Sequence, residues 1–229
     1  WRTSVSYSGF DNRITVDALA TDVYTDASWS SLDVKNRLNT RLREDIMLNA
    51  SIDYTHYFYQ PLQFSSRGGV GVLELPQSKP KRHGDEASVG IDLMHTVNSW
   101  FSYNAGLHGS VFHSNQLFWA CDPRITFHFY PAENHEISLH GGCYTQYFHK
   151  AGLTGGGLPT DFFMLADSTL PAGRAIATNL RYAASFLNHK WTFQIEGYFK
   201  QLYGVVESIG NIVQLINLGF DYEKYLITG

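Results

Sequence analysis

Apolar and polar side chains alternate one by one along most of this chain, which is the pattern of β-strands with two different faces. Residues 32–43, with the sequence LDVKNRLNTRLR, show the alternation clearly, because aliphatic positions are separated by charged or polar ones. No apolar stripe with the period of a helix extends over a useful length. The alternation therefore predicts an all-β chain of antiparallel strands, about eleven in number.

The predicted strands are separated by residues that favour turns. They cover residues 1–8, 14–18, 32–43, 48–55, 86–96, 100–113, 117–130, 135–149, 174–187, 190–204 and 213–227.

Short and long connections alternate between these strands. Short turns are predicted near residues 11, 44, 97, 132 and 188. The other connections are mostly longer and rich in Gly, Pro and Ser, and they cover about 20–30, 58–86, 114–117, 149–173 and 205–212. Bacterial outer-membrane barrels have tight periplasmic turns and longer outer loops. The pattern therefore predicts an antiparallel transmembrane β-barrel in the outer membrane of a Gram-negative cell.

Aromatic side chains concentrate at both ends of the predicted strands. Those near short turns are Phe10, Trp100, Phe101, Phe129, Tyr130 and Trp191. Those near longer connections are Tyr57, Phe58, Phe118, Trp119, Tyr147 and Phe148. Aromatics favour strands in general, but marking of both ends predicts the two interfacial girdles of a membrane barrel.

The composition limits the function classes. The 229 residues carry a net charge of −4 with 17 Lys and Arg, which gives no basic surface for nucleic acid. No run approaches the roughly 18 apolar residues that a transmembrane helix needs. The mean hydropathy of −0.21 is compatible with a barrel, because its lumen-facing side chains are polar. The chain opens at Trp1 already in the alternating pattern, so we expect a secretory signal to be cleaved or absent.

Opposite charges are predicted to meet on the polar face. A two-residue turn at Asn188-His189 places Arg181 directly opposite Glu196. A short turn at 44–45 likewise brings Asp53 beside Lys35 or Arg37. A face that is polar along whole strands suits a lumen better than a dry core.

The two cysteines, Cys121 and Cys143, lie on the apolar face of consecutive predicted strands. A three-residue turn near residue 132 places them opposite each other, at a spacing that a disulfide can bridge. A five-residue turn, or a bulge at Pro123, makes them diagonal neighbours, and two thiols facing lipid are the other interpretation.

Other reactive chemistry is not predicted. The ten histidines show no metal-ligand spacing, and Gly155-Gly156-Gly157 is not followed by the Lys of a phosphate loop. Asp161 falls in a loop and Glu196 faces an arginine, so they form no acid–base pair. We predict no catalytic residue, no metal site and no cofactor.

Several short motifs carry a family resemblance. Asp122-Pro123-Arg124 opens a strand, residues 144–149 (YTQYFH) end the next strand, and residues 156–162 (GLPTDF preceded by Gly) follow in a loop. Residues 195–200 (IEGYFK) lie in a later strand. In this order, over about residues 85–205, the motifs resemble the barrel of TonB-dependent receptors, in particular their large nutrient-uptake subfamily.

The resemblance also shows what is missing. Members of the family carry a plug domain and a segment that contacts TonB, and neither is found in residues 1–229. Receptors of this kind have about 22 strands around a plugged lumen. We therefore expect residues 1–229 to be about half of a receptor barrel.

The resemblance implies import of a nutrient, such as a glycan, a peptide or a chelated metal. Its implied partners are outer-membrane lipid and lipopolysaccharide, a TonB-type energy-transducing protein acting through the plug, and a surface lipoprotein. The ligand residues are expected at Tyr144, Gln146, Asp161 and Phe162, which flank the family-like loop.

Three alternatives remain open at this point. A transporter-derived barrel serving as a scaffold in an outer-membrane complex has no plug and no ligand-dependent uptake. A smaller complete barrel has an even number of strands and an enzymatic or adhesive site. A soluble β-sandwich buries the apolar faces of its sheets in one dry core.

Overall fold

The computed structural model describes residues 1–18, 21–68, 80–152, 161–187, 190–208 and 226–228. These residues form strands and their connections, and none of them belongs to a helix that is long and apolar enough to cross a membrane.

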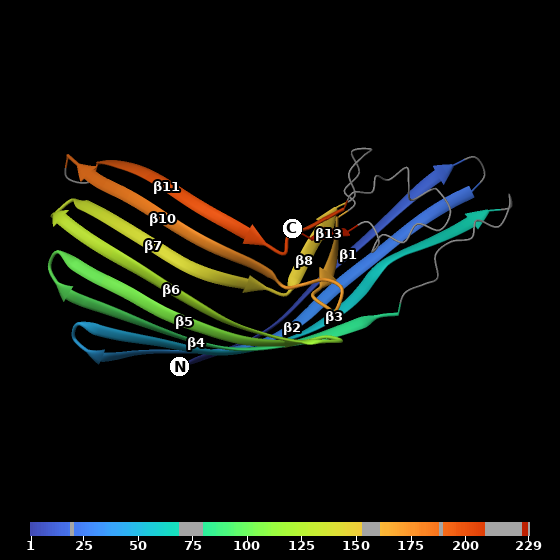
Figure 1. Ribbon diagram of the computed structural model, residues 1–229, viewed down its shortest axis with the longest axis horizontal. Helices are drawn as coiled ribbons and strands as arrows, with labels where there is room; N and C mark the ends of the chain where they lie inside the picture. Colours follow the sequence, from blue (N-terminus) through green and yellow to red (C-terminus); the bar gives the residue numbers. More distant parts are fainter. Residues whose placement is uncertain (19–20, 69–79, 153–160, 188–189, 209–225, 229) are drawn as a thin grey trace.

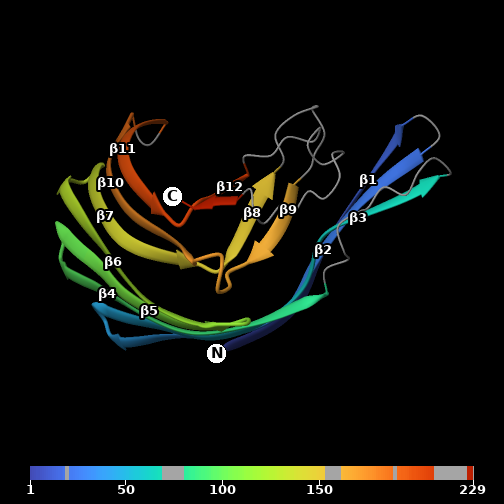
Figure 2. The same cartoon turned by 45° about the vertical axis from the view of Figure 1, so that its right-hand side comes forward.

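One antiparallel sheet of nine strands dominates the molecule (Figure 1). In sheet order its strands are β1 (Arg2–Ala18), β2 (Thr21–Arg43), β3 (Ile46–Gly68), β4 (Arg82–Asn98), β5 (Phe101–His113), β6 (Leu117–Ala132), β7 (His135–Gln146), β10 (Gly173–Phe186) and β11 (Trp191–Tyr203). The sheet curves into a trough (Figure 2).

Two short strand pairs accompany the large sheet. The first consists of β8 (Phe148–Gly152) and β9 (Asp161–Leu165), and Figure 2 shows it on the concave side of the trough. The second consists of β12 (Val206–Ser208) and β13 (Leu226–Thr228). The all-β, antiparallel class predicted from the sequence is confirmed.

The predicted short turns near 44, 97, 132 and 188 join β2–β3, β4–β5, β6–β7 and β10–β11, all at one end of the sheet (Figure 1). Two predictions in the first strands are wrong. There is no turn at Asp11-Asn12, because β1 is continuous there and Asp11 pairs with Ser28. The loop predicted at about 20–30 is strand from Thr21 onward, because β2 is continuous there. Two consecutive polar residues such as Asp11-Asn12 do not interrupt β1, because side chains there are exposed and need no apolar environment. The predicted strand 213–227 falls mostly outside the described residues.

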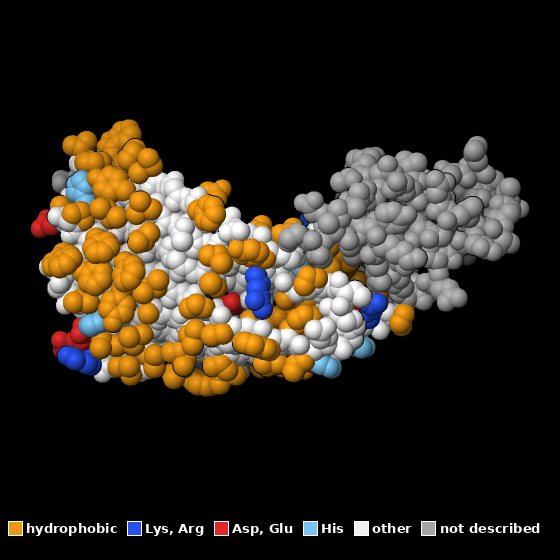
Figure 3. Space-filling model, in the orientation of Figure 1, with side chains coloured by type: hydrophobic (Ala, Val, Ile, Leu, Met, Phe, Trp, Pro, Cys, Tyr) orange, Lys and Arg blue, Asp and Glu red, His pale blue; other side chains and the backbone are white. Residues whose placement is uncertain are grey.

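One face of the sheet is apolar and exposed. The register aligns Val5 with Val34, Ile91 with Leu107, and Leu139 with Leu180. Such side chains stay open: Ile91 is 52% exposed and Leu107 is 51% exposed. Figure 3 shows hydrophobic side chains gathered over the left-hand part of the sheet, with the charged ones mainly at its margin. An apolar surface continuous over many strands marks contact with another apolar phase.

The other face carries charged and polar side chains that pair across strands. Arg37 of β2 pairs with Asp53 of β3. Arg124 of β6 reaches over β5 to Asp92 of β4 with two hydrogen bonds, of 2.8 and 2.7 Å. Compared with a water-soluble protein the faces are inverted, since the charges line the trough and the aliphatic side chains point away from it.

The Arg124–Asp92 pair depends on a glycine between the two strands. Gly106 lies opposite both residues in β5, and a Cβ there would lie 2.8 Å from Arg124 Nε and closer still to Asp92. Only a residue without a side chain lets the ion pair cross β5.

We therefore predict that Gly106→Ala lowers the free energy of unfolding by roughly 1–3 kcal/mol, because two charge-assisted hydrogen bonds are broken. Gly109→Ala is the matched control, since a Cβ there meets nothing within 4 Å. Urea unfolding of the full-length protein in lipid vesicles measures both. Equal stability of the two variants would contradict the prediction.

Candidate functional site

The hairpin of β8 and β9 packs against the inner face of the sheet. Met164 and Leu165 of β9 are 4% and 5% exposed, and Phe112 of β5 is fully buried beneath them. Tyr147 stacks on Phe112 with ring centroids 4.8 Å apart, and its hydroxyl lies 2.9 Å from that of Ser110. Apolar burial therefore holds the hairpin in the trough rather than outside it.

Aromatic contacts carry the hairpin across to the first strands. Phe148 of β8 lies 5.0 Å from Trp29 of β2, between ring centroids. Phe163 of β9 lies 5.9 Å from Trp29 and 5.1 Å from Phe10 of β1. The hairpin thus connects the β7–β10 side of the trough with the β1–β2 side and narrows the space between them.

This packing corrects part of the girdle prediction. Tyr57, Phe118, Tyr147 and Phe148 belong to or pack against the buried cluster under the hairpin. Phe10 also lies at this end and faces inward, against Phe163. Trp119, in contrast, is 73% exposed. Whether an aromatic residue points outward or into the trough depends on its odd or even position along the strand. The sequence prediction considered only its distance from a turn.

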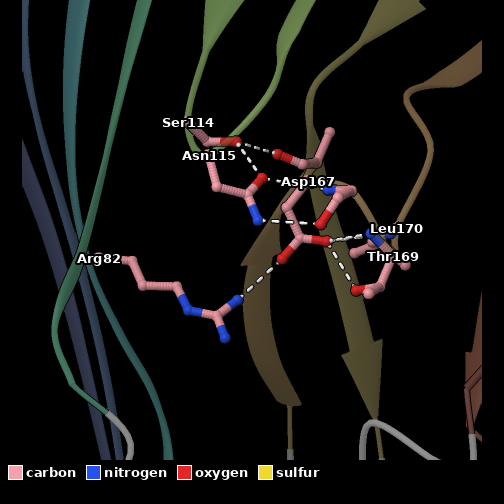
Figure 4. A network of polar contacts seen from close by, with 8 residues as sticks. Arg82, Ser114, Asn115, Asp167, Thr169 and Leu170 are labelled. Carbon is pink, nitrogen blue, oxygen red and sulfur yellow. Dashed lines mark hydrogen bonds and ion pairs between the residues drawn. The ribbon is translucent and has the colours of Figure 1, made fainter.

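A polar network fixes the chain that follows the hairpin (Figure 4). The Asp167 carboxylate pairs with Arg82 at 2.8 Å and accepts hydrogen bonds from Thr169 and from the backbone N–H of Leu170. Ser114 donates to the carbonyl oxygen of Ala166 at 2.7 Å. Asn115 makes two hydrogen bonds with Ser168. The network connects this segment to the start of β4 and to the β5–β6 turn.

His149 of β8 is the buried histidine of the hairpin. It is 7% exposed, and its Nε2 donates to the carbonyl oxygen of Pro171 at 2.8 Å. Burial lowers the pKa of His149, because the cationic form loses its hydration. The side chain is therefore neutral at pH 7 and ties β8 to the segment that leads into β10.

A hollow of about 750 Å³ opens between the hairpin and the last strands of the sheet. Its lining comes from β7, β8, β10, β11 and β12 and includes His140, Tyr144, Gln146, His149, Lys150, Arg174, Asn179, Tyr198 and Lys200. Its volume is in the range of small-molecule sites. We take this hollow as the candidate functional site.

Two of the four expected ligand residues line the hollow. Tyr144 is 40% exposed there, and the Gln146 amide turns back to donate to the backbone of Phe148. Asp161 and Phe162 pair through their backbones with Gly152 and Ala151, and their side chains lie outside what the structure describes.

The sequence reasoning missed Tyr198 and Lys200. A usable signal was present, because the register that puts Arg181 opposite Glu196 also puts Tyr198 opposite Asn179 and Lys200 opposite Ala177. All of these positions fall on the inner face.

The charged residues proposed from the sequence meet in a modified arrangement. Arg37 takes Asp53 as its partner, while Lys35 lies opposite Asp53 in register but has its ammonium 3.9 Å from Asp33. Arg181 lies opposite Glu196 as expected. Its side chain pairs instead with Glu136 of β7 at 3.9 Å, and Glu196 accepts a hydrogen bond from Asn179.

The structure places the two cysteines as free thiols. The β6–β7 ladder ends at Arg124 opposite Gly142, which leaves Cys121 three residues before Arg124 and Cys143 only one residue after Gly142. Pro123 has no N–H to extend the ladder, and the Asp122 carboxylate accepts from the backbone N–H of Thr145 instead, at 2.9 Å. The diagonal arrangement does not favour a disulfide.

No group of three metal-ligating side chains is found in the described part of the chain. The lining of the hollow offers aromatic rings, imidazoles, amides and amines.

The strand topology and the contrast between an apolar and a polar face define the fold class of this chain. It is a curved antiparallel sheet of the kind found in outer-membrane barrels. Comparison with solved structures supports this. The chain is similar to the FrpB iron transporter from Neisseria meningitidis in its F5-1 variant, with a TM-score of 0.56 and 11% identity over 90% of this chain and 38% of the transporter. For the F3-3 variant the TM-score is 0.54, with 11% identity over 89% of this chain and 38% of that chain.

A weaker similarity, with a TM-score of 0.48 and 10% identity, links 90% of this chain to 28% of the RagAB peptide transporter chain. No family model and no curated protein matches the sequence. The likeness thus concerns the fold, and the chain spans well under half of the transporters it matches.

We predict that Asp167→Ala loosens the hairpin far more than Arg82→Gln. Both changes remove the ion pair, but the first also removes the acceptor of three further hydrogen bonds, about 2–4 kcal/mol locally, whereas the second leaves those three hydrogen bonds in place. Hydrogen exchange of residues 148–165 in the full-length protein measures the difference. Protection that stays at the wild-type value in Asp167→Ala would refute the anchoring role.

We also predict that both cysteines are reduced. Denaturation without a reductant followed by maleimide should label both Cys121 and Cys143, giving a mass increase of two adducts. An unlabelled chain that takes up maleimide only after reduction would show the disulfide that the register disfavours.

Proposed function

We propose that this chain is part of the barrel of a TonB-dependent outer-membrane receptor that imports a nutrient ligand. The observation that carries the proposal is the inversion of the two faces over nine paired strands. Aliphatic and aromatic side chains point away from the trough, and paired charges point into it.

The exposed apolar face requires lipid. Each large apolar side chain left in water costs roughly 1.5–3 kcal/mol relative to burial, and this face exposes such side chains on every strand of the nine-stranded sheet. A soluble β-sandwich would bury them in a dry core. In the described residues the buried cluster lies instead on the opposite face, under the hairpin.

The trough supports a role in passage of a ligand. Its wall is polar, and the β8–β9 hairpin narrows it from within. The hollow beside the hairpin offers a place for a ligand to bind on its way. In the complete receptor, energy would come from a TonB-type protein acting through a plug, with outer-membrane lipid and a surface lipoprotein as further partners.

Uptake by the full-length receptor tests the proposal against the scaffold alternative. Deletion of the gene and deletion of its TonB-type partner should cause the same growth defect on the same nutrients. A receptor that is present in outer membranes but whose loss changes no nutrient requirement would indicate a scaffold. A protein that is extracted without detergent would contradict the membrane barrel itself.

A pair of neighbouring substitutions tests the lipid-facing side. Leu107 lies in the middle of β5 on the apolar face, and we predict that Leu107→Arg destabilises the barrel in vesicles by roughly 2–4 kcal/mol. His108→Arg is the matched control on the inner face, opposite Gly90 and Asp122. Equal losses in the two variants, measured by urea unfolding, would mean that the apolar face does not contact lipid.

A further inference from the structure

A second hollow opens on the outer, apolar side of the sheet, where β6 and β7 separate. The β6–β7 ladder ends at Arg124 opposite Gly142. Beyond this pair the Asp122 carboxylate accepts from the backbone N–H of Thr145 at 2.9 Å. The space beside the parted strands has a volume of about 540 Å³.

The hollow combines one cation with aromatic, aliphatic and thiol side chains. The register, followed from Leu107 across β6, β7, β10 and β11, places these side chains on the outer face. The thiol side chains are small, so they leave room between their larger neighbours. The residues concerned are Trp119, Cys121, Cys143, Arg174, Ile176 and Tyr203.

Arg174 is exposed at the start of β10, and none of the described carboxylates forms an ion pair with it. Asp122 also borders the hollow, but it is 8% exposed, lies on the inner face opposite His108 and is hydrogen-bonded to Thr145. On the lipid side of a barrel, an arginine costs about 2–4 kcal/mol at the midplane of the bilayer and about 0–1 kcal/mol near the interfaces. Arg174 therefore belongs at the level of the lipid headgroups.

The position of Arg174 along β10 agrees with that depth. It lies twelve residues from Phe186, where β10 reaches the short turn (Figure 1). At about 3.4 Å per residue and a strand tilt of about 40°, this distance crosses about 30 Å, the thickness of the hydrocarbon core. Because the tight turns of such barrels face the periplasm, Arg174 lies at the outer leaflet.

Neighbouring strands carry ionisable groups at the same level. On β4, Asp85 lies thirteen residues from Asn98 at the short-turn end, and it pairs with His56 of β3 at 2.7 Å. His113 of β5 lies opposite Asp85.

Between the two levels the outer face is uncharged. On β10 the outer positions from Arg174 to Phe186 are Ile176, Thr178, Leu180, Tyr182 and Ala184. On β4 those that follow Asp85 are Ala87, Val89, Ile91 and Leu93. Arg174 thus stands at the margin of an apolar band about as tall as a membrane is thick.

We infer that this hollow binds a phosphorylated glycolipid of the outer leaflet, with Arg174 on a phosphate and an acyl chain in the groove between Trp119 and Tyr203. A guanidinium group binds phosphate through two parallel hydrogen bonds, and Trp and Tyr favour the headgroup level. The inference rests on the membrane-barrel part of the proposed function. It gives the lipopolysaccharide partner a defined site, which takes its lipid A portion.

Native mass spectrometry of the delipidated full-length receptor in detergent tests this inference. Hexa-acylated diphosphoryl lipid A should bind, and the same lipid without its phosphates should bind about tenfold more weakly, because Arg174 then lacks a counter-charge. An excess of inorganic phosphate should not displace lipid A, because it has no acyl chain to fill the hollow.

Substitutions locate the site. Arg174→Gln should weaken binding of diphosphoryl lipid A about tenfold, and Arg174→Lys should retain most of it. Arg43→Gln is the matched control, because the Arg43 side chain is 72% exposed and lies at the short-turn end of β2. Cys121→Phe fills the hollow without changing its charge and should also weaken binding.

Equal binding of the two lipids, displacement by inorganic phosphate, equal effects of Arg174→Gln and Arg43→Gln, or unchanged binding in Cys121→Phe would overturn the inference. Such a result in a detergent-extracted barrel with TonB-dependent uptake would leave the proposed function intact. Failure of the proposed function would be recognised separately, by extraction without detergent or by uptake that does not depend on the TonB-type partner.

Discussion

The cross-strand register is the constraint on which the rest of this structure depends. In lipid, no water is available for unpaired N–H and C=O groups, so each strand must pair with its neighbours along its length. The nine-stranded ladder provides this pairing with two irregular points between β2 and β3, one between β4 and β5, and one between β6 and β7. Because side chains alternate along each strand, the register also assigns the described residues of the sheet to the apolar outer face or to the trough.

The hairpin of β8 and β9 shows how this constraint is used for function. A loop that leaves β7 could lie outside the barrel, but Phe112 and Tyr147 are inward positions and give it an apolar surface to cover. The Asp167 network then fixes the returning chain. A hydrophobic core thus forms inside an otherwise polar trough, and a hollow lined by aromatic and polar residues opens beside it.

Several residues show how far sequence reasoning reaches. The opposition of Arg181 and Glu196 followed from turn length alone, yet the ion partner of Arg181 is Glu136 on the other neighbouring strand. The length of a turn fixes the register with the one strand that the turn connects, whereas a strand inside the sheet, such as β10, pairs with two neighbouring strands. Likewise Tyr144 and Gln146 were chosen from the loop motif, while Lys200 required the register of a third strand to be extended to the far end of β11.

The sequence by itself determined the all-β class, most of the strands after residue 80, the apolar and polar faces, and the end of the sheet that carries the short turns, because period-two alternation and turn residues are local properties. Tertiary structure decided which aromatics are exposed on the outer face and which pack under the hairpin. It also decided that Cys121 and Cys143 are free thiols, and that residues of β7, β8, β10 and β11 line one hollow. These outcomes depend on how the curvature of the sheet brings strands that are distant in the sequence close together across its concave side. No local sequence pattern encodes that curvature.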